Sequence, residues 1–183
     1  MKIVLIRHGK PSAAHNPKLN AAEYTDWVRQ YNFSEVSAES RPINIDAHYQ
    51  SFYALSSDLP RAIHSSEIYT GKSPQQINRL YREMDIPRYK IPLKLRAWTW
   101  VYLSRLLWIL GIKGRFETFK DAKQRANEAA SQLVEIAEKE NNVVLFGHGV
   151  MNRYIRKALI EKGWHLENKS NAYWGVTSLV AVK

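Results

Sequence analysis

The chain has 183 residues, enough for one domain with its own core, and 45% of them are hydrophobic. It contains no cysteine, so disulfides, thiolate nucleophiles and cysteine-bound metals are excluded. The net charge of +10 predicts attraction to anions, but it does not by itself distinguish nucleic acid, an acidic membrane surface and a phosphorylated substrate.

Neither the N-terminus nor the longest apolar stretch indicates a membrane-spanning or exported chain. The N-terminal apolar run stops at Arg7, far short of the apolar region of a signal peptide. The longest apolar stretch, residues 97–112, is interrupted by Arg105 and is too short to span a bilayer comfortably. Together with the lack of cysteine, these features lead us to expect a cytoplasmic protein.

In chain order, the first predicted element is a buried strand over residues 2–6, a short run of branched apolar residues that ends before Gly9. A helix is predicted over residues 21–31, with Asn20 placed to cap it. Residues 35–49 show weak periodicity and indicate a loop.

A second strand is predicted over residues 51–55. Ser57 or Asp58 is expected to cap the helix that follows, because Pro60 would then lie in its first turn. Gly71 is expected to end this helix.

The remaining elements alternate between strand and helix. Short strands are predicted over residues 76–81 and 143–146, and a final strand over 176–182. Helices are predicted over residues 119–140, where alanines recur at helical spacing, and over 152–162. This alternation predicts an α/β sheet protein.

Two of these strands end in nearly the same tripeptide. Arg7-His8-Gly9 follows the first strand and Gly147-His148-Gly149 follows the strand near residue 145. In open α/β sheets, functional sites form outside the carboxyl ends of the strands, so both histidines are expected at one edge. A single histidine at a strand end is more often structural, but two such phrases in one domain favour a common site.

An arginine and a carboxylate extend the same constellation. Arg61 lies in the segment 56–62 and Glu83 in the segment 80–83, each just beyond a predicted strand. Either residue alone is explained as well by a solvated surface position. Because guanidinium groups match phosphate oxygens, two arginines, two histidines and a carboxylate at one edge predict a phosphate site.

The sequence resembles the histidine phosphatase superfamily, the phosphoglycerate mutase-like group. The resemblance rests on IRHG at residues 6–9, SSDLPRA at 56–62, LYRE at 80–83 and LFGHG at 145–149, in the family's order and spacing. It covers nearly the whole chain. It implies a single domain over residues 1–183: a three-layer α/β sandwich around a largely parallel central sheet, with a helical cap insertion.

The resemblance also implies roles for individual residues. His8 would be the nucleophile that becomes phosphorylated, and Glu83 the general acid for the leaving oxygen. The residues implied to bind the phosphoryl group are Arg7, Gly9, Arg61, His148 and Gly149. We expect no cofactor and no metal, because the arginines and His148 supply the positive charge.

The sequence also departs from the family's common pattern. Lys10 and Pro11 follow the first motif where many members have an acidic residue and a threonine. Residues 84–87 replace a common Gly-Trp-Glu-Gly phrase, and Asp85 within them is a rival to Glu83 as the acid. Phrases specific to mutases are missing, which favours a phosphatase.

The predicted function is therefore a metal-independent phosphatase that acts through a phosphohistidine on a small phosphorylated metabolite or a phosphoprotein. The alternatives are a catalytically silent module that recognises phosphate, and a phosphoglycerate mutase-like phosphotransferase. No nucleic-acid partner is expected, because no recognised motif accompanies the basic charge.

One long segment, residues 88–118, contains none of these motifs. It is rich in tryptophan and leucine, interleaved with lysine and arginine. We expect it to be a cap over the site or, through residues 97–112, a surface for self-association or for peripheral contact with an anionic membrane.

Overall fold

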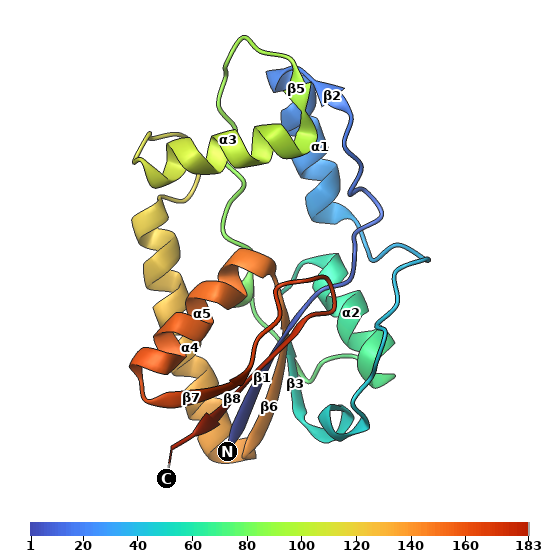
Figure 1. The fold of residues 1–183 in the computed structure, drawn as a ribbon, viewed down its shortest axis with the longest axis vertical. Coiled ribbons are helices and arrows are strands. Elements are labelled where there is room, and N and C mark those ends of the chain that lie inside the picture. Colours follow the sequence, from blue (N-terminus) through green and yellow to red (C-terminus); the bar gives the residue numbers. More distant parts are fainter. Residues whose placement is uncertain (183) are drawn as a thin grey trace.

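The computed structural model describes residues 1–182, and a mixed sheet lies at its centre (Figure 1). The strands of this sheet are β1 (Lys2–Arg7), β3 (Tyr53–Ser56), β4 (Gln76–Ile77), β6 (Asn142–Gly147), β7 (Trp164–Asn168) and β8 (Val176–Ala181). Their spatial order is β4-β3-β6-β1-β8-β7, and only β8 runs against the others. The largely parallel sheet is as predicted.

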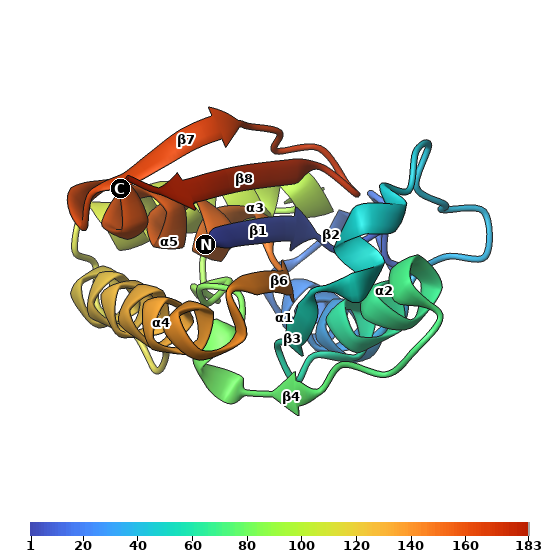
Figure 2. The same ribbon diagram turned by 90° about the horizontal axis from the view of Figure 1, so that it is seen from below.

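Helices cover both faces of the sheet. The α-helices of the described residues are α1 (Ala21–Phe33), α2 (Pro60–Thr70), α3 (Ala97–Ile109), α4 (Phe119–Glu140) and α5 (Gly149–Glu161). Seen from below, α4 and α5 lie on one side of the sheet and α2 on the other (Figure 2). The three-layer α/β sandwich is therefore confirmed.

The two cores follow from the alternation of side chains along the strands. In β1, Ile3 and Leu5 pack toward α4 and α5, whereas Val4 and Ile6 pack toward the α2 side. The face that α4 turns to the sheet is mostly alanine, which lets the helix approach closely. Its buried residues are Ala122, Ala126, Ala129, Ala130, Leu133 and Ala137.

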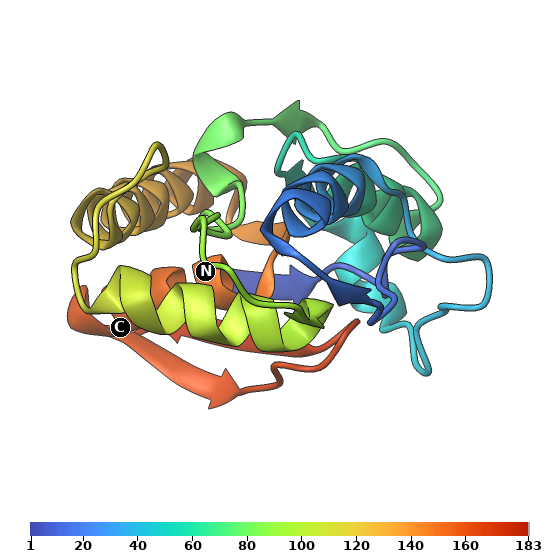
Figure 3. The same cartoon turned by 90° about the horizontal axis from the view of Figure 1, so that it is seen from above.

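A third core lies beyond the carboxyl ends of the parallel strands. There α1 and α3 pack together beside a small sheet of β2 (Lys18–Leu19) and β5 (Leu95–Arg96), and we call these four elements the cap (Figure 3). Its core is aromatic: the rings of Tyr24 and Trp100 stack with centroids 5.2 Å apart. The predicted cap segment is thus joined by α1, which lies in the sequence between the first motif and the second.

Some local predictions were wrong. Residues 76–81 form the short β4 and then a 3₁₀ turn, Arg79–Tyr81, and β7 was not predicted. Neither Ser57 nor Asp58 caps α2, whose N-cap is Leu59 without a side-chain hydrogen bond. The capping of α1 by Asn20 and the end of α2 at Gly71 are confirmed.

Two further boundaries differ from the predictions. The helix predicted from residue 152 begins at Gly149, and a 3₁₀ helix, Ala47–Ser51, precedes β3. The early start of α5 brings its first backbone N–H groups to the sheet edge, where the predicted site residues lie. In residues 1–182, we find no helix with both the length and the apolar character needed to cross a membrane.

Candidate active site

The predicted nucleophile, His8, follows β1 directly and is almost fully buried, with 2% of its surface exposed. Its backbone N–H donates to the carbonyl of Gly147 at 2.9 Å, which ties together the two histidine phrases. Its ring Nδ1 lies 2.7 Å from the Gly9 carbonyl oxygen. Because a carbonyl only accepts hydrogen bonds, Nδ1 carries the proton and Nε2 holds the free electron pair.

Arg61 faces that electron pair. It lies in the first turn of α2, is fully buried, and donates from Nε to His8 Nε2 at 3.3 Å. Its Nη1 donates to the carbonyls of Tyr31 and Asn32, at the end of α1. Burial, followed by the charge of Arg61, holds the pKa of His8 well below its ordinary value of 6.5. His8 is therefore neutral at neutral pH, as a nitrogen nucleophile must be.

Arg7, the last residue of β1, also brings its guanidinium near His8. Its Nη1 donates to the carbonyl of Asn171 at 2.7 Å, and its guanidinium lies 4.2 Å from the centre of the Tyr173 ring. A Cβ at Gly149 would lie 3.1 Å from Arg7 Nε, so glycine there allows the close approach. Gly9 is similarly confined, since a Cβ would meet the Trp174 ring at 2.5 Å.

His148 ends the turn between β6 and α5 and is fully buried. Its ring centroid is 5.0 Å from that of His8, and its Nε2 lies 2.6 Å from the hydroxyl of Ser57. Burial and the charge of Arg61 lower the pKa of His148 well below 6.5. The structure therefore brings four of the predicted residues together around one buried point: Arg7, His8, Arg61 and His148.

Three nitrogen atoms at this point lack a hydrogen-bond partner among the described residues. They are Nε of Arg7, Nη2 of Arg61 and Nδ1 of His148, and each is buried. A buried polar group without a partner is costly and rare, so the arrangement suits a ligand that supplies acceptors. Two guanidinium groups beside it select an anion with several oxygens.

The carboxylate of Glu83 lies at the N-terminus of α5. Its Oε1 accepts the backbone N–H groups of Met84 and Met151 at 3.0 and 2.9 Å, and Oε2 accepts that of Val150 at 3.3 Å. On the cap side, Nη2 of Arg105 is 3.9 Å from Oε2. Glu83 and Arg7 line the same cavity, so the predicted acid faces the predicted phosphate site.

Asp85 does not share this position. Its Oδ2 accepts the backbone N–H of Glu117 at 3.0 Å. Asp85 lines a surface hollow that Glu83 also borders, but it does not line the cavity that contains Arg7. Arg125 on α4 fixes the intervening chain, because its Nη1 donates to the carbonyls of Leu80 and Arg82 and its Nη2 to that of Glu83. The geometry favours Glu83 over Asp85 as the carboxyl group that can reach a bound phosphate.

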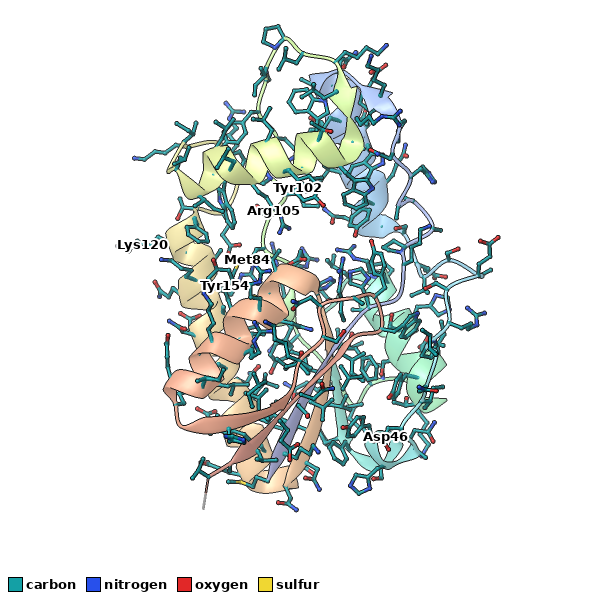
Figure 4. The ribbon with its side chains drawn as sticks, viewed as in Figure 1. Asp46, Met84, Tyr102, Arg105, Lys120 and Tyr154 are labelled. Carbon is teal, nitrogen blue, oxygen red and sulfur yellow. The ribbon has the colours of Figure 1, made fainter. Side chains whose placement is uncertain are left out.

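The cavity above the strand ends measures about 420 Å³. Of the strand-end groups, Arg7 and Glu83 line it, whereas His8, Arg61 and His148 lie buried behind its lining. The rest of the wall is largely aromatic and comes from both the cap and the body of the protein. Figure 4 shows Tyr102 and Arg105 extending from α3 toward Met84 and Tyr154 on the opposite side. The aromatic and aliphatic residues of the wall are Tyr31, Ile86, Trp98, Val101, Tyr102, Trp108, Ile109, Phe119, Val150 and Tyr154.

Several of these site residues were missed by sequence reasoning. Ser57 was predicted to cap a helix, but its hydroxyl contacts His148 instead. Asp58 is likewise engaged, since it accepts from Nη2 of Arg82 at 2.7 Å and so joins two of the motifs. The signal available for Asn171 and Tyr173 was weak: a polar and aromatic segment before the last strand.

Within residues 1–182, no three or more His, Asp or Glu side chains are grouped so that they could hold a metal ion.

The comparisons with known proteins give the family and the fold. The model of the histidine phosphatase superfamily (branch 1) matches residues 3–183, and the chain belongs to this family. No curated protein matches the sequence.

Solved structures share the fold at low identity. A phosphoserine phosphatase from Entamoeba histolytica, in complex with 3-phosphoglyceric acid, is 16% identical with a TM-score of 0.59, covering 97% of this chain and 89% of that one. The ecdysone phosphate phosphatase of Bombix mori, in complex with tungstate, is 12% identical with a TM-score of 0.57, covering 100% and 92%. A putative alpha-ribazole-5'-P phosphatase from Escherichia coli is 18% identical with a TM-score of 0.57, covering 89% and 79%.

Proposed function

We propose that the protein is a phosphomonoesterase that forms a covalent phosphohistidine on Nε2 of His8. The observation that carries this proposal is the state of the His8 ring. Nδ1 donates to the Gly9 carbonyl, so the free electron pair of Nε2 points to Arg61 in a site with unpaired nitrogen donors. A neutral, oriented nitrogen beside an anion site is what attack on phosphorus requires.

The reaction divides into two displacements. In the first, His8 Nε2 attacks phosphorus, the bond to the leaving oxygen breaks, and Glu83 gives that oxygen a proton. In the second, Glu83 takes a proton from water, the water oxygen attacks phosphorus, and the bond to Nε2 breaks. Arg7, Arg61 and His148 would hold the phosphoryl oxygens throughout, as cationic and hydrogen-bonding groups do in other phosphoryl transfers.

The cavity supports a small phosphorylated molecule with an apolar leaving group as substrate. Its volume of about 420 Å³ is that of a small-molecule site, and α3 lies over it as a roof. The roof supplies Trp98, Tyr102 and Trp108 to the wall, which favours aromatic or hydrocarbon groups over the polar backbone of a phosphoprotein.

Trapping of the intermediate tests the proposal. Protein incubated with a substrate labelled in its phosphoryl group and quenched in base should carry label that is lost in acid, as a phosphoramidate is. His8→Ala should carry none, whereas His165→Ala, which removes an exposed histidine in β7, should be labelled normally. Turnover and labelling should persist after exhaustive chelation of metals.

Two outcomes would reject the proposal. Undiminished turnover in His8→Ala would remove His8 from the mechanism. Tight binding of vanadate or phosphate, with neither label nor turnover for any phosphomonoester, would indicate a silent phosphate-recognising module.

A further inference from the structure

Helix α3 carries a row of apolar side chains that no part of the described chain covers. Each keeps half or more of its surface exposed, although the helix is otherwise well packed. We call this row the free face of α3; its residues are Tyr102, Leu106, Ile109 and Leu110, with Ile112 in the turn that follows.

The free face is a continuous stripe. Tyr102, Leu106, Ile109 and Leu110 are spaced four, three and one residues apart, which places them on one side of an α-helix. The opposite side packs against α1, where Trp100 is fully buried against Tyr24. The exposure of these side chains therefore follows from the way α3 is anchored.

Positive charge is concentrated in the segment of the chain that contains this stripe. Residues 86–116 contain seven lysines and arginines and no aspartate or glutamate, so this segment holds most of the chain's net charge of +10. All of these basic residues except Arg105 are exposed. A strongly basic segment without a single acidic residue favours an acidic partner.

The apolar and basic groups lie side by side at the C-terminal end of α3. Ile109, Ile112, Lys113 and Lys120 line one groove of about 260 Å³. Figure 4 places Lys120 at the start of α4, beside this end of α3. An apolar stripe edged by lysines is the pattern of a helix that lies in the interface of a membrane.

We propose that the free face of α3 docks on the surface of an anionic lipid bilayer. Its apolar side chains would enter the boundary of the acyl chains, while Lys113, Lys120 and their basic neighbours meet the lipid phosphates. Charge argues against a second copy of the chain, because a symmetric contact would set one wholly basic segment against another. Nucleic acid would satisfy the charge but leave the leucines uncovered.

Docking has a consequence for the cavity. Tyr102 and Ile109 belong both to the free face and to the wall of the 420 Å³ cavity. The mouth of the cavity would then open at the lipid surface, where a phosphomonoester with a hydrocarbon leaving group would accumulate. The docking itself does not depend on the proposed chemistry.

Sedimentation with vesicles tests the inference. The protein should pellet with vesicles of phosphatidylcholine and phosphatidylglycerol, and much less with phosphatidylcholine alone. The double variant Leu106→Glu/Leu110→Glu should bind the anionic vesicles at least about tenfold more weakly, because two apolar side chains are lost. Neither residue lines the cavity, so turnover of p-nitrophenyl phosphate in solution should not change.

The matched control is Ile43→Glu/Val182→Glu, which introduces the same charge at two exposed apolar side chains outside the cap. It should retain most of the binding. Equal loss in the two double variants, or equal binding to both kinds of vesicle, would overturn the inference. So would a dimer in sedimentation equilibrium that Leu106→Glu/Leu110→Glu abolishes, because the free face would then be a contact between two copies.

Discussion

The strand-end site, which reaches the cavity through Arg7 and Glu83, and the cap are built differently. At the strand ends, His8, Arg61 and His148 are buried and fixed by backbone or side-chain contacts to the body of the protein. Across the cavity, Tyr102 is 72% exposed, and α3 is anchored by the small core that it shares with α1 and by Trp108, which packs into the main core beside α4. The strand-end groups are therefore enclosed on all sides, whereas α3 keeps one face exposed.

This difference suggests a division of labour. Groups that must match a phosphoryl group within fractions of an ångström need rigid support, which buried strand ends provide. A wall that only needs to contact an apolar leaving group tolerates looser support. If this division holds, changes at the strand ends should remove chemistry, and changes in the cap should alter the choice of substrate.

The largest expected effect is at Arg61. Arg61→Lys keeps the charge but loses the fork that contacts both His8 and the end of α1, so we expect kcat to fall by about 10³-fold. Steady-state kinetics with p-nitrophenyl phosphate measures this, together with vanadate affinity. Arg29→Lys, on the exposed side of α1, is the matched control and should behave as the parent. A fall confined to KM would place Arg61 outside the chemical step.

A smaller loss, dependent on the leaving group, is expected at Glu83. Glu83→Gln should lower kcat/KM by about 10²-fold for an alkyl phosphate, whose leaving oxygen needs a proton, and far less for p-nitrophenyl phosphate. Asp85→Asn should show no such contrast, because Asp85 does not line the cavity that Glu83 and Arg7 share. The reverse result would make Asp85 the acid and would move the chemistry away from the cavity.

The buried histidines should also make the free energy of unfolding depend on pH. The pKa values of His8 and His148 are lowered in the folded state. As the pH falls below 6.5, these two side chains therefore take up protons in the unfolded chain but not in the folded protein. Each histidine should then lower the free energy of unfolding by about 1.4 kcal/mol per pH unit until its folded pKa is reached. Above 6.5 this contribution is constant.

Urea unfolding between pH 4 and 8 measures this slope. His148→Gln should reduce it in the acidic range, whereas His165→Gln, at an exposed position, should leave it unchanged. An unchanged slope in His148→Gln would mean that His148 is protonated in the folded protein.

The smallest effect is expected in the cap. Tyr102→Ala should raise KM about fivefold for a phosphomonoester with a bulky aromatic leaving group and leave that for ethyl phosphate unchanged. Thr99→Ala, at an exposed position of the same helix outside the cavity wall, is the control. A loss of kcat for both substrates in Tyr102→Ala would break the proposed division, because the cap would then support the chemistry.

The strand-end site was predictable from sequence because its residues follow strands directly. The parallel arrangement of β1, β3 and β6 is enough to bring Arg7, His8 and His148 to one edge. The sequence could not predict which side chains have hydrogen-bond partners elsewhere in the chain. Ser57 and Asp58 have the chemistry of N-caps, but His148 and Arg82 bind them, and those contacts span distant parts of the chain.

The cap was predictable in composition but not in arrangement. The tryptophans of residues 88–118 indicated packing, but not their partners. Trp98 and Trp100 pack against α1, which lies more than sixty residues earlier, whereas Trp108 packs against Phe119 of α4. β7 was missed for a local reason: its middle residues, His165-Leu166-Glu167, are largely exposed at the edge of the sheet, so no apolar pattern marks it. Long-range contacts and exposed edges are the features that periodicity does not record.

The guanidinium of Arg61 joins the two regions. Its Nε contacts His8 at 3.3 Å, and its Nη1 binds the carbonyls of Tyr31 and Asn32 at 3.1 and 3.3 Å, where α1 leaves the cap. Anything that favours one position of α1 therefore also favours one position of the cation at the nucleophile. Such a connection is thermodynamically reciprocal: if occupation of the cap tightens the hold on an oxyanion, the oxyanion must tighten the hold on the cap's ligand by the same factor.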